Sequence, residues 1–81
     1  MKSYWFYVAL RVADTPEKIS RLRNLVGAAV EGVIHSKNYF VLNQEGGTKM
    51  CFYIGVIDEH NSDAVEDAID SALLVFANET L

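Results

Sequence analysis

The segment 4–12 constrains the fold more than any other part of the sequence, because it is almost entirely apolar. Side chains on a β-strand alternate between the two faces of a sheet. One face of this segment therefore carries Tyr4, Phe6, Val8, Leu10 and Val12. The other face carries Trp5, Tyr7, Ala9 and Arg11. Both sets are largely apolar, so we predict a first strand that needs cover on both of its faces.

A helix is predicted to follow over residues 16–31. Asp14 or Thr15 can accept hydrogen bonds from its first amide groups, and Pro16 suits the first helical turn. Apolar residues recur along it at the spacing of an amphipathic helix, namely Ile19, Leu22, Leu25 or Val26, Ala29 and Val33. Gly32 is expected to end the helix, because glycine readily adopts the left-handed conformation found at helix ends.

Two β-type segments, 39–42 and 49–57, come next. The connection between them contains Gly46 and Gly47, which is typical of a hairpin, so the two strands are expected to pair antiparallel. The longer strand is expected to direct four apolar side chains into the core: Met50, Phe52, Ile54 and Val56. We predict that the opposite face of the sheet collects Trp5, Tyr7, Tyr39, Val41, Cys51 and Tyr53.

A second helix is predicted over residues 63–76. Its apolar residues keep the spacing of a core-facing stripe: Val65, Ala68, Ile69, Ala72, Leu73 and Phe76. Four acids recur on the outward side, and we call them the acidic stripe: Asp63, Glu66, Asp67 and Asp70. Residues 58–81 hold seven acids and no Lys or Arg, whereas residues 1–57 hold seven Lys and Arg against four acids. The chain is therefore electrically two-sided.

The predicted order is strand, helix, strand, strand, helix within a single α+β domain spanning residues 1–81. This β-α-β-β-α order, with a three-stranded antiparallel sheet and two helices on one face, is ferredoxin-like but lacks the last strand. In the complete fold that strand lies beside the first one, so an apolar edge is expected to stay open here. We predict a homodimer that pairs through its first strands, with an interface formed by Trp5, Tyr7, Ala9 and Tyr53.

Catalytic, metal and cofactor chemistry find little support in the sequence. The single cysteine, Cys51, excludes an intrachain disulfide and favours a reducing, cytoplasmic location. His60 with Asp63 or Glu59 offers mixed metal ligands but no EF-hand loop. Cys51 with His35 lacks a third group to orient a nucleophile and its base. No apolar run is long enough to span a membrane. We therefore predict no catalytic residue, no metal, no cofactor and no membrane contact.

Residues 10–16, Leu-Arg-Val-Ala-Asp-Thr-Pro, resemble the strand-to-helix junction of ACT regulatory domains. Those domains bind small effectors, often amino acids, at dimer interfaces, so the resemblance implies a small-molecule-sensing function. The family usually has glycine after this proline, where the ligand approaches the backbone, whereas Glu17 stands here. The last strand of the family's fold is also missing.

The aromatic sheet face has two interpretations, because the RNA recognition motif also stacks bases on aromatics of its first and third strands. No stretch of this sequence resembles that family's basic-glycine-aromatic signature, and a net charge of −4 opposes binding to a nucleic-acid backbone. Trp and Tyr are also favoured anchors of protein interfaces. We therefore expect a protein interface at this face and no direct nucleic-acid binding.

The acidic stripe is the second candidate surface, and with Glu59 it forms the predicted partner-binding site. Uncompensated carboxylates repel one another and steer association toward a basic groove. The expected function is a non-enzymatic protein-binding module. We expect a small homodimeric inhibitor or adaptor that engages a basic surface, such as that of a nucleic-acid-handling protein, by analogy with phage accessory proteins. The alternative is an ACT-like sensor of small molecules.

Overall fold

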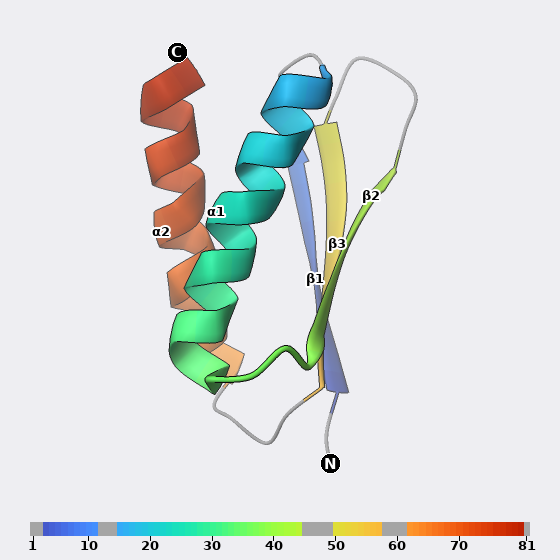
Figure 1. Cartoon of the computed structure of the whole chain (residues 1–81), viewed down its shortest axis with the longest axis vertical. Coiled ribbons are helices and arrows are strands. Elements are labelled where there is room, and N and C mark those ends of the chain that lie inside the picture. The colour runs from blue at the N-terminus through green and yellow to red at the C-terminus, as the bar shows by residue number, and fades with distance from the viewer. Residues whose placement is uncertain (1–2, 12–14, 45–49, 58–61, 81) are drawn as a thin grey trace.

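The computed structural model describes residues 3–11, 15–44, 50–57 and 62–80. Five elements follow the predicted order (Figure 1): β1 (Ser3–Leu10), α1 (Pro16–Ile34), β2 (Tyr39–Gln44), β3 (Met50–Ile57) and α2 (Ser62–Thr80). The strands form one antiparallel sheet in the order β1-β3-β2. Both helices pack side by side on one face of this sheet. The predicted α+β fold is therefore confirmed.

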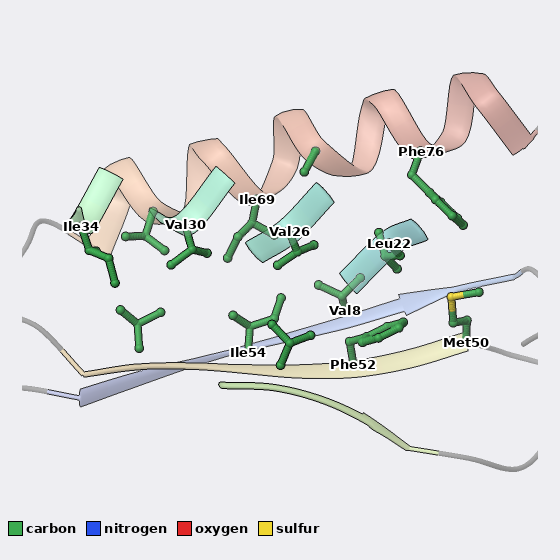
Figure 2. Close-up of a cluster of buried hydrophobic side chains, with 14 residues drawn as sticks. Val8, Leu22, Val26, Val30, Ile34, Met50, Phe52, Ile54, Ile69 and Phe76 are labelled. Atoms are coloured by element: carbon green, nitrogen blue, oxygen red, sulfur yellow. The ribbon is translucent and has the colours of Figure 1, made fainter. Parts of the chain in front are cut away.

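The hydrophobic core lies between the sheet and the helical layer, where side chains from both layers point toward one another (Figure 2). The central strand β3 is covered best, since Phe52 is 1% exposed and Ile54 is fully buried. The predicted core face of β3 is confirmed. Both helices present apolar stripes to this face, made of Leu22, Val26, Val30 and Ile34 on α1 and of Val65, Ile69, Ala72 and Phe76 on α2.

Helix α1 begins as predicted and ends later than predicted. The hydroxyl of Thr15 accepts a hydrogen bond from the Lys18 amide at 3.4 Å, which caps the first turn. Gly32 does not end the helix, because Ile34, one turn beyond Val30, adds a buried side chain to the core. The left-handed residue that ends α1 is His35, with φ 55°, and its amide donates to the carbonyl of Glu31 at 2.9 Å.

The second helix also runs past its predicted end at Phe76. Its last turns bring Glu79 to Arg21 of α1, where the guanidinium donates two hydrogen bonds, of 2.8 and 2.5 Å, to the carboxylate. This bidentate contact raises the pKa of Arg21 and lowers that of Glu79. It ties the start of the chain's first helix to the end of its second.

Neither helix in the described part of the chain combines the length and the apolar character that crossing a membrane requires.

Candidate functional site

The sheet face that points away from the helices carries no charged side chain among its paired residues, and the exposed Arg11 follows directly after the end of β1. Strand register places three rows of side chains on it: Trp5, Gly55 and Phe40, then Tyr7, Tyr53 and Leu42, then Ala9, Cys51 and Gln44. We call these residues, together with Ser3 and Ile57, the outer face. Six of its large apolar side chains are solvent-exposed, from Trp5 and Tyr7 at 57% to Ile57 at 36%. No helix of the described residues covers this face (Figure 1).

Two residues predicted for the outer face lie elsewhere. Tyr39 and Val41 point to the helices, because they pair with the core residues Val56 and Ile54 and directly paired residues share a face. Val41 is buried, and Tyr39 packs against the core. Their places on the outer face are taken by two neighbours that sequence reasoning missed, Phe40 and Leu42. The predicted interface residues Trp5, Tyr7, Ala9 and Tyr53 do share the outer face.

The aromatic side chains of the outer face contact one another and the strand beneath them. The Trp5 indole lies over Gly55 so closely that a Cβ at Gly55 would meet the ring at 2.7 Å. The rings of Tyr7 and Tyr53 lie 5.0 Å apart at a tilt of 47°. The Tyr7 hydroxyl donates to the Cys51 sulfur at 3.3 Å, and this bond raises the pKa of Tyr7. A hollow of about 130 Å³ remains between Trp5 and Phe40.

The edge of β1 is open, and the hydrogen-bonding pattern shows which backbone groups it presents. The Ile57 amide donates to the carbonyl of Asn38, so in β3 the odd-numbered residues bond to β2 and the even-numbered ones to β1. The backbone groups of β1 that point away from β3 then belong to Ser3, Trp5, Tyr7 and Ala9. Among the described strands, none pairs with this edge.

A groove of about 270 Å³ runs between the β1 edge and α2. One wall is the strand segment 6–10, and the other is formed by Glu66, Ile69, Asp70 and Leu73. The core-facing side chains of β1 are incompletely covered here. Phe6 and Leu10 are only half-buried, whereas Phe52 on the central strand is buried. The groove thus combines an open strand edge, an apolar floor and two carboxylates.

The opposite edge of the sheet, at β2, is partly covered by side chains of α1. Arg23 donates hydrogen bonds of 3.0 Å to the Val41 carbonyl and to the Asn43 side chain. Glu31 accepts a bond of 2.7 Å from the Tyr39 hydroxyl and lies 2.9 Å from the Lys37 ammonium. The bond from Lys37, followed by that from Tyr39, lowers the pKa of the Glu31 carboxyl. Burial, followed by the bond to Glu31, raises the pKa of Tyr39.

We expect Glu31→Gln to destabilise the protein at neutral pH and to lose that effect in acid. Because the folded-state pKa of Glu31 is lowered, its carboxylate stabilises the fold above the ordinary glutamate pKa of about 4.3, and this contribution disappears as the pH falls through the lowered value. Urea unfolding at neutral pH and near pH 3 measures the difference. Glu66→Gln removes a carboxylate without an ion pair among the described residues and serves as the control. A Glu31→Gln effect of equal size at both pH values would contradict this account.

The structure divides the predicted partner-binding residues. Asp63, Glu66, Asp67 and Asp70 are all exposed on α2. Two of them, Glu66 and Asp70, lie in the groove beside β1, whereas Asp67 is outside it. Glu59 is outside the described residues. The prediction of an acidic binding site stays untested, but its members now fall into those at the β1 groove and those away from it.

The structure does not assemble the chemical sites that the sequence offered as alternatives. Cys51 pairs with Gln44 at one end of the sheet, whereas His35 precedes β2, whose first residue pairs with Val56 near the other end. His60 and Glu59 lie outside the described residues. Among the residues that the structure does describe, no group of three or more His, Cys, Asp or Glu side chains could hold a metal ion.

The junction that resembles ACT domains is only partly described, because residues 12–14 lie outside the described ranges. Comparison of the chain with family models, with curated proteins and with solved structures finds no match in any of the three. The candidate functional surfaces of this chain are the outer face and the β1 groove.

Proposed function

We propose that this chain is a cytoplasmic, non-catalytic protein-binding module that forms a homodimer through its outer face and uses its acidic α2 to engage a partner with a basic surface. The observation that carries the proposal is the exposed, apolar and uncharged outer face. A face without charge does not repel a second copy of itself. The dimer leaves α2 free, because both helices lie on the other side of the sheet.

The size of the outer face supports this role. An aromatic side chain buries about 150–250 Å², so the four half-exposed aromatics present on the order of 300–500 Å². Apolar patches of about 300–600 Å² on monomers are often functional. A standard interface buries roughly 800 Å² on each partner, with an apolar centre and a more polar rim. The outer face supplies such a centre, and Ser3 and Gln44 lie at its margins.

Packing between outer faces accounts for a dimer better than direct pairing of two β1 strands. Hydrogen-bonded strands lie about 4.8 Å apart. Packed helices need about 8–10 Å between their axes. Helix α2 covers the β1 side of the sheet, since the two elements line one groove, so pairing two β1 edges would force two α2 helices too close together. Two sheets stacked face to face, about 10 Å apart, bring no helices together.

We expect Leu42→Ala to weaken self-association by about tenfold, because burial of a half-exposed leucine contributes about 0.7 kcal/mol and the symmetric dimer buries two copies of it. Leu42 is 53% exposed on β2, the strand farthest from the β1 edge. Leu74→Ala is the matched control, since Leu74 is an exposed leucine on α2. Sedimentation equilibrium over a range of concentrations measures the dissociation constant of each variant.

The same experiment separates the two dimer geometries. Pairing through β1 edges would leave Leu42→Ala and Leu74→Ala equally without effect, because neither side chain lies at that edge. A wild-type protein that stays monomeric at high micromolar concentration would exclude the homodimer altogether. Circular dichroism of each variant verifies that the fold is retained.

A further inference from the structure

We propose that the open edge of β1 binds an extended, basic segment of the partner protein, which adds to the sheet as a fourth strand beneath α2. This inference rests on the proposed function, and it replaces a general acidic surface with a defined groove and a defined form of partner. The juxtaposition that carries it is an unpaired strand edge beside two carboxylates, Glu66 and Asp70, over incompletely covered apolar residues.

The backbone of β1 has hydrogen-bonding groups available for the addition of a strand. Trp5, Tyr7 and Ala9 each direct an amide and a carbonyl toward the open edge, and such a row of unpaired groups is a template for another strand. An incoming strand would place alternate side chains on the outer face beside Trp5 and Tyr7. The remaining side chains would point into the groove beside Phe6 and Leu10.

The width of the two layers leaves room for one further strand. Two packed helices span about 20 Å, at about 10 Å for each. Three strands at about 4.8 Å span about 14 Å, and four span about 19 Å. A single added strand therefore matches the helical layer. It would also cover Phe6 and Leu10, which are only half-buried at present.

Charge determines which segment fits. Helix α2 contains no Lys or Arg, and neither Glu66 nor Asp70 forms an ion pair within the described residues. Lysine or arginine suits the groove-facing positions, because its aliphatic stem can pack on Phe6 and Leu10 while its charged end reaches the carboxylates. A second copy of β1 does not fit, since residues 3–10 contain no basic side chain.

Two synthetic peptides test the inference on the intact protein. Both have the length of β1, eight residues, with blocked termini. One alternates valine with lysine, and the other alternates valine with glutamate, so that strand propensity is kept and charge is reversed. We expect the lysine peptide to bind at least about tenfold more tightly, as measured by nuclear magnetic resonance titration. Equal affinity of the two peptides would overturn the proposal.

Hydrogen exchange locates the peptide and tests for backbone pairing. We expect the amides of Trp5, Tyr7 and Ala9 to become protected on binding, and those of Val41 and Asn43, at the β2 edge, to stay unchanged. A lysine peptide that is N-methylated at alternate residues on its pairing edge should lose its binding. Binding of the methylated peptide with unchanged affinity, or an absence of protection in β1, would exclude strand addition.

A matched pair of charge reversals tests the groove itself. Asp70→Lys places a positive charge in the groove and should weaken the lysine peptide by about tenfold while strengthening the glutamate peptide. Asp67→Lys makes the same change three residues away and outside the groove, and should alter affinity by less than about threefold. Equal losses in the two variants would mean that the stripe attracts the peptide as a whole, which would overturn the groove assignment.

The outcomes distinguish this inference from the proposed homodimer. Self-association is read by sedimentation and depends on Leu42, whereas peptide binding is read at the amides of β1 and depends on Asp70. Leu42→Ala should therefore leave the affinity for the lysine peptide intact. If the protein stays monomeric but still binds the lysine peptide, the strand addition stands and the homodimer is excluded. If the protein dimerises as expected but does not bind the peptide, only the strand addition is excluded.

Discussion

Phe52→Ala should lower the free energy of unfolding by about 3–5 kcal/mol, which is a large part of the protein's total stability. Phe52 is 1% exposed on the central strand β3, and its side chain lies in the core between the sheet and the helical layer. Truncation of a buried phenylalanine costs about 3–5 kcal/mol, because transfer energy is lost and a cavity remains. A domain of 81 residues has a total stability of only about 4–12 kcal/mol. Urea unfolding followed by circular dichroism measures the loss.

Phe40→Ala is the matched control for this loss. Phe40 lies on a neighbouring strand, but it is 52% exposed on the outer face. Its truncation should change the free energy of unfolding by less than about 1 kcal/mol in the monomer. Similar losses for Phe40→Ala and Phe52→Ala would contradict the division of the sheet into a core face and an outer face.

Trp5→Ala should weaken the homodimer by about 30-fold or more while the monomer stays folded. Tryptophan is the residue most enriched among interface hot spots, and such residues contribute about 2 kcal/mol or more. Trp5 is 57% exposed, lies over Gly55 and borders the hollow next to Phe40, which a side chain of the second copy can fill. Sedimentation equilibrium gives the dissociation constant.

The control for this prediction is Val75→Ala, because Val75 is an exposed apolar residue on α2, away from the outer face. Trp5 is also the only tryptophan in the chain, so its emission should shift to shorter wavelength as the wild-type protein is concentrated and the outer face is buried. A Trp5→Ala variant that associates like the wild type would remove the outer face as the dimer interface.

The regular patterns of the sequence were sufficient to predict the fold. Alternation in β1 and β3 predicted which side chains face the core, and Val8, Phe52 and Ile54 are indeed buried, whereas the neighbouring Tyr7 and Tyr53 are exposed. The three-four spacing of α2 likewise predicted its buried side. These patterns are strong because burial of apolar surface decides them, and burial repeats with the period of the element.

Features that depend on tertiary contacts could not be read in this way. The segment 39–42 is apolar throughout, so alternation alone could not show that Val41 is buried and Leu42 exposed. Gly32 resembled a helix end, but burial of Ile34 extended the helix past it. The groove beside β1 is formed by two elements that are distant in sequence. The sequence alone therefore could not show that Glu66 lies in this groove and that Asp67 lies outside it.

The hydrogen bond from the Arg23 guanidinium to the Val41 carbonyl affects how readily copies of this protein can polymerise through their sheet edges. A sheet with two free edges can add subunits indefinitely, which is the route to fibres. Here the Arg23 side chain already occupies one backbone acceptor of the β2 edge, whereas no such bond is found at the β1 edge among the described residues, so we expect edge pairing to be favoured at β1. Arg23→Ala would open the second edge, and the variant should be more prone to ordered aggregation than the wild type.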